Sequence, residues 1–431
     1  MTLQSSLLAA VDVVADRTGW LGRRLQAENL LRTAQRRTGL QDLGDPSVLG
    51  PLQRLLDALV SEASLSTVGR LAARSDVIRL LSNLLRLAAE EVSAPATLRQ
   101  RIEQPIFITG LPRSGATFLQ RLLLDDPRNR APLIWQTIYP YPPAHGSDRR
   151  VEAVERQLKA FERLAPEFHQ LNPLSATSPQ ECSEITAHVF RSLRFGTSYD
   201  VPSYRAWVDD AGHTPAYRFH KRFLQHLQHQ DSVVGIRPGC WVLKCPDHVF
   251  SLDAIRTIYP DARLIFVHRD PVSVLGSVAT LTERIRAPFT RHLDPRAIGR
   301  QESARWHEGA RQMIRASRDS EFELPICHVH YLDLVTDPMA TIEGVYQQFG
   351  MRLSAEAQKW MLRAIGREPR AAYPQHSYRF EDHGFNVAYE RAKFREYMVE
   401  FGIQPEGTDS AVGASLPRYH GGTSLSSRHY S

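Results

Sequence analysis

The strongest structural signal in this chain is the stretch Pro105-Ile-Phe-Ile-Thr-Gly-Leu-Pro-Arg-Ser-Gly-Ala-Thr117. Its first residues form a short apolar run, which is typical of a buried strand. From Phe118 onward, apolar residues return at the spacing of one helix face. The sequence therefore predicts a strand, a glycine-containing loop and a helix that begins near Thr117.

The loop between this strand and this helix has the spacing of a phosphate-binding loop. Gly110 and Gly115 fit the pattern G-x-x-x-x-G, and Thr117 stands where such loops carry Ser or Thr. Ala116 replaces the lysine that serves the γ-phosphoryl group in nucleotide hydrolases, and Arg113 places a positive charge inside the loop. Because backbone N–H groups at a helix N-terminus hold oxyanions, the pattern favours a nucleotide with a shorter anionic tail.

Composition sets broad bounds on the kind of protein. The chain has 431 residues, 42% of them hydrophobic and 23% charged, which is ordinary for a soluble globular protein. No run approaches the ~18 apolar residues of a membrane span, and the N-terminus lacks a basic-then-apolar signal pattern. The 4 cysteines show no CxxC spacing and indicate reduced thiols. We therefore expect a cytoplasmic protein without a membrane span.

Three parts of the chain differ in their patterns. Residues 1–100 are rich in Leu, Ala, Arg and Glu, and leucine stripes such as Leu52, Leu55, Leu56 and Leu59 predict a helical N-terminal segment with a leucine core. Asp45 or Ser47 could cap one of its helices. Residues 405–431 are rich in Gly and Ser and predict a flexible C-terminal tail. The main domain is expected between them, at 101–404.

The main domain shows further strand signals followed by helical sequence. Short apolar runs occur at 240–245, 263–268 and 325–331, and their alternation with helices predicts an α/β fold with a P-loop-type parallel sheet flanked by helices.

The stretch between the loop helix and the second strand is too long for an ordinary crossover. We expect it to hold a helical substrate-recognition insertion at 130–235, with helices at 149–165, 179–194 and 214–229. The Pro- and Tyr-rich segment Pro132–Gly146 predicts an irregular loop. Its aromatic residues between Trp135 and Tyr141 suit either an apolar or sugar-like ligand or core packing.

A second candidate anion site follows the strand at 263–268. Asp270 can cap the next helix, and Pro271 fits the first turn of that helix. Arg269 would then stand at the carboxyl end of a parallel strand, where open α/β sheets bind ligands. Ser277 lies two turns into the helix.

Together these elements resemble the sulfotransferases that use 3′-phosphoadenosine 5′-phosphosulfate (PAPS), most closely the bacterial type. The loop resembles their 5′-phosphosulfate loop, usually Leu-Pro-Arg-[Ser/Thr]-Gly-Thr-Thr, from which Ala116 departs. Arg269 and Ser277 resemble the 3′-phosphate site, and Tyr331 resembles the tyrosine that lies against adenine. The resemblance implies PAPS as co-substrate, no metal, and cofactor contacts from Leu111, Pro112, Arg113, Ser114, Gly115, Ala116, Thr117, Phe118, Arg269, Ser277 and Tyr331.

Sulfuryl transfer needs cations to stabilise charge and a base to take the proton of the acceptor. Arg113 is the candidate on the phosphate side. Lys244 is the second, because it ends an apolar strand that would not tolerate a lone buried lysine. Its Leu-Lys-x-Pro context also resembles the strand that carries a catalytic lysine in sulfotransferases.

Two residues compete for the role of general base. His248 lies near the position of the histidine base of soluble animal sulfotransferases, and imidazole has a suitable pKa. Glu181 belongs to a segment resembling one in the bacterial subgroup, but Ser178-Pro179-Gln180-Glu181 also fits a capping box. His188 could lie on the same helix face as Glu181. Spacing alone does not separate the two candidates.

The sequence therefore predicts a PAPS-dependent sulfotransferase that acts on a hydroxyl or amine of a small-molecule, lipid or glycan acceptor. A catalytically degenerate sulfotransferase-fold protein that only binds a nucleotide is the alternative. A P-loop kinase or NTPase would need a lysine at Ala116 and an acidic Mg²⁺ ligand at a strand end, where His268 and Arg269 stand instead. No pattern indicates nucleic-acid binding, and the sequence does not define the acceptor or the oligomeric state.

Overall fold

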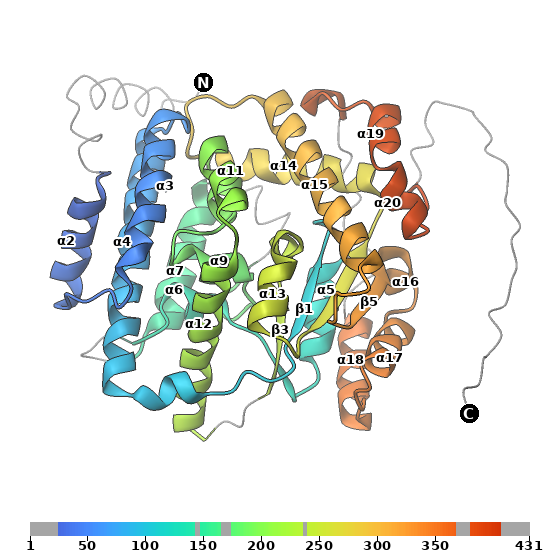
Figure 1. Cartoon of the computed structure of the whole chain (residues 1–431), viewed down its shortest axis with the longest axis horizontal. Coiled ribbons are helices and arrows are strands. Elements are labelled where there is room, and N and C mark those ends of the chain that lie inside the picture. The colour runs from blue at the N-terminus through green and yellow to red at the C-terminus, as the bar shows by residue number, and fades with distance from the viewer. Residues whose placement is uncertain (1–24, 143–146, 165–173, 236–238, 368–379, 407–431) are drawn as a thin grey trace, which may run out of the picture.

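The computed structural model describes residues 25–142, 147–164, 174–235, 239–367 and 380–406. At its centre lies a parallel sheet of 5 strands in the order β2-β3-β1-β4-β5 (Figure 1). The strands are β1 (Ile106–Gly110), β2 (Asn129–Arg130), β3 (Cys240–Lys244), β4 (Arg263–His268) and β5 (Ile326–His330). The predicted α/β class and parallel sheet are confirmed. Strand β2 was not predicted, because Asn-Arg carries no apolar pattern.

Both faces of the sheet are buried, as a parallel sheet requires. Along β1, Ile106 and Ile108 point to one apolar layer, and Phe107 points to the other. The register places Ile108 opposite Lys244 of β3 and opposite Ile265 of β4. All strands run in one direction, so their carboxyl ends meet at the same edge of the sheet.

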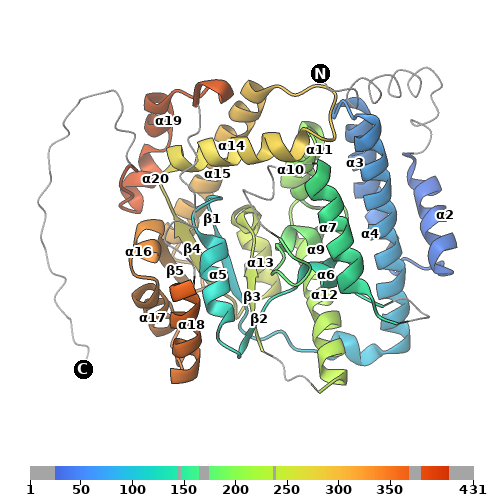
Figure 2. The same cartoon turned by 180° about the vertical axis from the view of Figure 1, so that it is seen from behind.

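One layer of helices covers the face that holds Ile106 and Ile108 (Figure 2). It consists of α5 (Ala116–Leu124), α17 (Pro338–Gln348) and α18 (Ala355–Arg367). Helix α5 contacts β1 and β3, α17 contacts β5, and α18 packs on α5. The helix predicted to begin near Thr117 is therefore present and starts one residue earlier.

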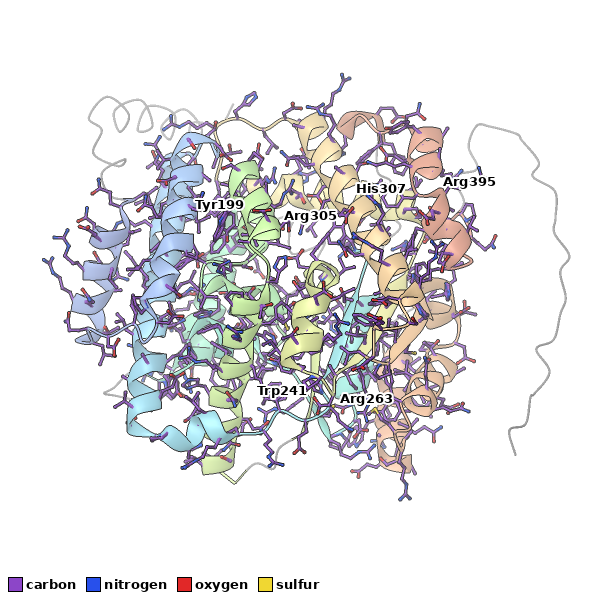
Figure 3. The ribbon with its side chains drawn as sticks, in the orientation of Figure 1. Tyr199, Trp241, Arg263, Arg305, His307 and Arg395 are labelled. Carbon is purple, nitrogen blue, oxygen red and sulfur yellow. The ribbon has the colours of Figure 1, made fainter. Side chains whose placement is uncertain are left out.

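The other face of the sheet is covered by elements that follow β3 and β4 along the chain. They are η4 (Pro246–Ser251), α13 (Leu252–Ile258), α14 (Pro271–Arg286) and α15 (Pro295–Arg318). The chain then passes through α16 (Tyr331–Thr336), α17 and α18 to η5 (Phe380–His383), α19 (Val387–Lys393) and α20 (Arg395–Glu400). Figure 3 shows side chains filling the space between these layers, with Trp241 and Arg263 at the amino ends of β3 and β4.

The described part of the N-terminal segment is helical. Its elements are α2 (Ala27–Thr38), η2 (Pro46–Val48), α3 (Leu49–Ser61), α4 (Thr67–Ser93) and η3 (Pro95–Arg99). The predicted leucine stripes are buried, and Asp45 caps η2 by accepting from the Ser47 N–H. Residues 1–24 and the tail beyond Glu406 lie outside the described residues. Among the helices described, none has the length and apolar character needed to cross a membrane.

The segment 130–235 is largely helical but differs from the prediction in detail. Its helices are α6 (Ile134–Ile138), α7 (Arg150–Leu164), α9 (Cys182–Ala187), α10 (Arg194–Ser198), α11 (Pro202–Asp210) and α12 (Thr214–Val233). The prediction of a purely irregular loop at Pro132–Gly146 is wrong, because α6 lies within it. Here Arg150 stacks over the half-buried Trp135, and the hydroxyl of the buried Tyr141 contacts His226, so both aromatic side chains contact other protein groups.

The helix predicted at 179–194 is shorter than expected. Phe190 adopts a positive φ of 53°, which an α-helix does not tolerate. Its buried ring stacks on Phe195, and its carbonyl accepts a hydrogen bond from the Tyr204 hydroxyl at 2.9 Å. Tertiary packing therefore breaks the helix that the local pattern favoured.

Candidate active site

The β1–α5 loop is shaped to hold an anion with its backbone. Gly110 has a φ of 137°, and a Cβ there would lie 2.3 Å from the Val267 carbonyl oxygen, so only glycine fits. Arg113 and Gly115 also have positive φ values of 62° and 86°. Gly115 is the N-cap of α5, and it has no side chain to cap the helix. The Ser114 hydroxyl is buried without a hydrogen-bond partner among the described residues, which suits an anionic ligand.

The residues predicted for the second anion site lie against this loop. Arg113 Nε donates to Ser277 Oγ at 3.1 Å, and Arg269 Nη1 donates to the Arg113 carbonyl at 2.7 Å. The Arg269 guanidinium stacks over the Tyr331 ring, 3.9 Å from its centroid. The same ring lies beside Gly115, 3.2 Å from where a Cβ would be. The segments that follow β1, β4 and β5 at the carboxyl edge of the sheet thus bring together the predicted residues Arg113, Arg269, Ser277 and Tyr331.

Local sequence explains how these side chains are positioned. The Asp270 carboxylate caps α14 by accepting from the Val272 N–H at 3.1 Å, and Pro271 occupies the first turn, as predicted. This cap fixes the turn that follows Arg269. Asp337 likewise caps α17 after the short helix that starts at Tyr331. One partner was not predicted: Arg269 also forms an ion pair with Glu406.

Lys244 and Glu181 form an ion pair beside the loop strand. Lys244 Nζ lies 2.7 Å from Glu181 Oε1. Lys244 is buried at the end of β3, whereas the Glu181 side chain is 42% exposed. The capping-box interpretation of Glu181 is wrong, because α9 begins at Cys182 and the Ser178 hydroxyl bonds to Ser175. The Glu181 carboxylate is thus available to the site.

A buried charge network connects the N-terminal segment to the helix that follows Glu181. On α4, Arg79 pairs with Glu184 of α9 at 2.6 Å, and Asp76 pairs with Arg194 of α10 at 2.7 Å. Burial alone would raise the pKa of Asp76, but Arg194 and Arg79 hold it well below its usual range. The network therefore stays charged at neutral pH and fixes α9 against α4.

The two predicted histidines differ in their surroundings. The His248 ring is 1% exposed; its Nδ1 contacts the Tyr217 hydroxyl, and its Nε2 has no hydrogen-bond partner in the described part of the chain. Burial lowers the pKa of His248 well below its ordinary value, so the imidazole is neutral at physiological pH. His188 is fully buried and contacts Asn83, and burial lowers its pKa to about 3, which indicates a structural role.

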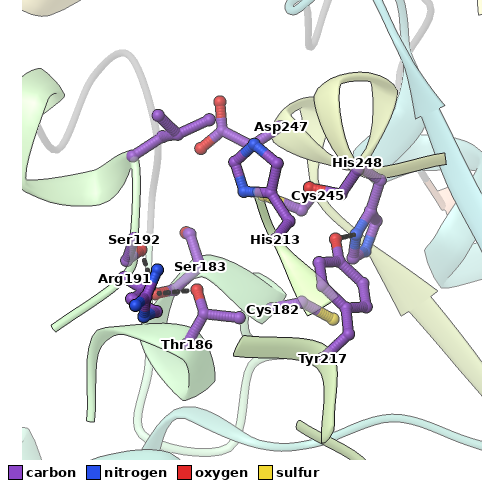
Figure 4. A pocket seen from close by; sticks show the side chains of 12 residues that line it. Cys182, Ser183, Thr186, Arg191, Ser192, His213, Tyr217, Cys245, Asp247 and His248 are labelled. Carbon is purple, nitrogen blue, oxygen red and sulfur yellow. Dashed lines mark hydrogen bonds between the residues drawn. The ribbon is translucent and has the colours of Figure 1, made fainter. Parts of the chain in front are cut away.

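A small polar cavity is lined by Cys182 and Cys245, the residues that directly follow Glu181 and Lys244 in the chain (Figure 4). It has room for about one water-sized group, with a free volume of about 20 Å³. Its lining includes His248, Asp247, His213 and Arg191. The pKa of Asp247 is raised to about 7, mainly by burial; Arg305 opposes this rise and the nearby charge of Glu181 adds to it. Burial lowers the pKa of His213 to about 4.

Three of these lining residues were not identified from the sequence. Asp247 immediately precedes His248, so its position in the Lys-Cys-Pro-Asp-His segment could have drawn attention to it. Arg191 and His213 belong to separate segments and have no local signal. The described residues hold no group of three or more His, Cys, Asp or Glu side chains arranged to bind a metal ion.

Comparison with known proteins agrees with this arrangement. The sequence model of the sulfotransferase family matches residues 105–355, more than half of the chain. This chain therefore belongs to the sulfotransferase family.

Two similar solved structures are the sulfotransferase STF1 from Mycobacterium tuberculosis H37Rv and the sulfotransferase STF9 from Mycobacterium avium. STF1 is 29% identical with a TM-score of 0.71, covering 86% of this chain and 98% of STF1. STF9 is 26% identical with a TM-score of 0.75, covering 89% of this chain and 98% of STF9.

A curated relative is the omega-hydroxy-beta-dihydromenaquinone-9 sulfotransferase Stf3 of Mycobacterium tuberculosis, with a counterpart in Mycobacterium bovis. Each is 24% identical over 264 residues, which is 58% of this chain. The match spans 63% of the length of these relatives.

Proposed function

We propose that this protein transfers the sulfuryl group of PAPS to a hydroxyl group of a lipid-like acceptor. The observation that carries the proposal is the convergence of Arg113, Ser277, Arg269 and Tyr331 on one anion-binding loop. Lys244 ends the neighbouring strand β3, where the register sets it opposite Ile108 of β1, and it pairs with Glu181, the residue before α9. This arrangement supports anion binding and proton transfer at the same edge of the sheet.

The donor would be held by two clusters of groups. The loop from Leu111 to Phe118 supplies backbone amides for the 5′-phosphosulfate, and these do not depend on the hydroxyl missing at Ala116. Arg269 and Ser277 would bind the 3′-phosphate, and the Tyr331 ring offers a face to the adenine. No bound metal is needed for these contacts.

The proposed transfer step uses Glu181 as the base and Lys244 and Arg113 as the stabilising cations. The acceptor oxygen attacks sulfur, a new O–S bond forms, and the bond between sulfur and the bridging phosphate oxygen breaks. The electron pair stays on the leaving 3′-phosphoadenosine 5′-phosphate, and Glu181 takes the acceptor proton. Lys244 and Arg113 stabilise the charge that develops on the oxygens.

Glu181 fits the role of base better than His248 does. Its carboxylate is partly exposed and lies 2.7 Å from the candidate catalytic lysine. His248 is buried, and the lowered pKa of its imidazole makes it a weaker proton acceptor. Its unpartnered Nε2 and the small cavity suit orientation of the acceptor hydroxyl instead.

A second cavity supports an acceptor with an apolar tail. It has a free volume of about 370 Å³ and lies between α4 and α12. Its lining is apolar at Leu84, Leu87, Val189 and Phe219 and charged at Asp45, Arg191, Arg218 and Arg222. Arg191 lines both this cavity and the small one, and in this proposal the tail of the acceptor lies in the large cavity and its hydroxyl lies near the small one. The relative Stf3 is named for a menaquinone-type acceptor, which is also lipid-like.

Filling the large cavity is expected to change the preference for acceptor length. Val189→Trp should raise KM for sulfation of 1-decanol roughly tenfold or more, since each lost buried CH₂ costs about 0.8 kcal/mol. Sulfation of 1-butanol should change little, which makes the short alcohol an internal control for folding. The measurement is the transfer of ³⁵S from PAPS to each alcohol. Equal losses for both alcohols would remove this cavity from the acceptor site.

The donor assignment is tested by calorimetric titration with 3′-phosphoadenosine 5′-phosphate. Arg269→Ala should weaken binding by about 1.5–3 kcal/mol, or roughly 10- to 100-fold, because a charge-assisted pair to the 3′-phosphate is lost. Affinity for adenosine 5′-phosphosulfate, which lacks that phosphate, should change much less.

Arg263→Ala is the matched control, since Arg263 lies at the opposite end of the same strand and binds Gln104. Equal losses for both nucleotides would remove Arg269 from the 3′-phosphate site. A preference of the wild type for ATP–Mg²⁺ would contradict PAPS as donor. Nucleotide binding without transfer to any acceptor of a broad panel would favour a degenerate, binding-only protein.

A further inference from the structure

Arg269 is engaged by a carboxylate from the end of the described chain. Its Nε lies 2.7 Å from Glu406 Oε1, and its Nη2 lies 2.8 Å from Glu406 Oε2. This is the two-point geometry in which a guanidinium also holds a phosphate. The site proposed for the 3′-phosphate is therefore occupied by an internal anion.

The described segment that leads to Glu406 is anchored at two points. After α20, Ile403 is buried, and its N–H donates to the Met398 carbonyl at 2.9 Å. The Glu406 N–H donates to the Asp270 carboxylate at 2.9 Å, next to Arg269 along the chain. Both side chains of the ion pair are 21% exposed, so water still reaches it.

Two further contacts of Arg269 show why Glu406 and a 3′-phosphate would compete for the same edge of its guanidinium group. Nη1 donates to the Arg113 carbonyl, and the guanidinium plane stacks on Tyr331, so two sides of the group are held by the donor site itself. The Nε–Nη2 edge is the one that meets Glu406. One edge cannot make two-point contacts to a carboxylate and a phosphate at once.

We propose that Glu406 acts as a displaceable gate on the donor site, holding Arg269 until a 3′-phosphate takes its place. The proposal rests on the assignment of Arg269 to the 3′-phosphate in the proposed function. Only a nucleotide that bears this phosphate replaces the lost ion pair with another. The gate therefore lowers donor affinity, moves the segment after α20 when the donor binds, and favours release of the nucleotide product.

The gate predicts that removing the carboxylate tightens nucleotide binding. Glu406→Gln and Glu406→Ala should bind 3′-phosphoadenosine 5′-phosphate about three- to tenfold more tightly than wild type, because the competing state is lost. Adenosine 5′-phosphate should bind all forms within about twofold, since it does not need Arg269. Calorimetric titration of the full-length proteins measures both ligands.

Glu400→Gln provides the matched control. Glu400 lies close to Glu406 in the sequence and also pairs with an arginine, Arg318. That change should leave both affinities as in wild type. A second readout is hydrogen exchange of the Glu406 amide, which should lose protection when 3′-phosphoadenosine 5′-phosphate binds.

The outcomes separate the gate from the donor assignment. Tighter binding in both Glu406 variants, or binding only in these variants, supports the gate. If wild type binds with a dependence on the 3′-phosphate but the variants bind equally or more weakly, the gate is wrong and the proposed function stands. If neither wild type nor variants distinguish the two nucleotides, the donor assignment fails and the gate with it.

Discussion

Replacing Lys244 with methionine is expected to slow sulfuryl transfer by about 10²–10³-fold. The ammonium group is the buried cation nearest the candidate base, and methionine keeps most of its length while removing the charge. Because the proposed donor site consists mainly of the loop and Arg269, affinity for 3′-phosphoadenosine 5′-phosphate should remain close to that of wild type. The measurement is single-turnover transfer from PAPS beside a calorimetric titration.

Lys221→Met is a suitable control for this experiment. Lys221 is a half-buried lysine on α12. Its Nζ donates to the Ile258 carbonyl at 3.2 Å and has no proposed part in the site. Its variant should retain the transfer rate. If Lys244→Met transfers sulfate at the wild-type rate, Lys244 has only a structural role in supporting Glu181.

Glu181→Gln is expected to lower the transfer rate by about 10²–10⁴-fold, which is the usual contribution of a general base. Glutamine preserves the shape of the side chain and can still accept a hydrogen bond from Lys244, but it cannot take a proton. The effect should appear in kcat with little change in the affinity for 3′-phosphoadenosine 5′-phosphate. Steady-state kinetics with a saturating acceptor measure it.

The same assay with His248→Gln distinguishes the two candidate bases. If His248 orients the acceptor hydroxyl, its variant should raise KM for the acceptor more than it lowers kcat. Full loss of kcat in His248→Gln, together with an active Glu181→Gln, would reverse the assignment. A histidine buried with its pKa lowered makes that result unexpected.

Several elements could be predicted from the sequence because their causes are local. The apolar run before Gly110 and the two glycines of the loop specify a strand and a phosphate-type turn within about a dozen residues. Asp270-Pro271 predicted a helix start, and Asp270 caps that helix. The leucine stripes of the N-terminal helices are buried as expected.

Other features depended on partners that are far apart in the chain. The capping pattern at Ser178 was a reasonable local interpretation, but Glu181 instead meets Lys244, 63 residues away. The helix expected through 194 ends early because Phe190 packs against Phe195 and Tyr204. Local propensity is worth less than 1 kcal/mol per residue, so burial of a large aromatic ring overrides it.

By itself, the sequence determined the parallel sheet, the anion loop and the family resemblance, because short-range patterns encode each of them. Only the tertiary structure decided which distant side chains meet. These contacts are the hydrogen bond from Arg113 to Ser277, the ion pair of Lys244 with Glu181 and the ion pair of Arg269 with Glu406. Such contacts join residues 63 to 164 positions apart. No periodicity records them, since they arise only when the carboxyl ends of parallel strands are brought to one edge.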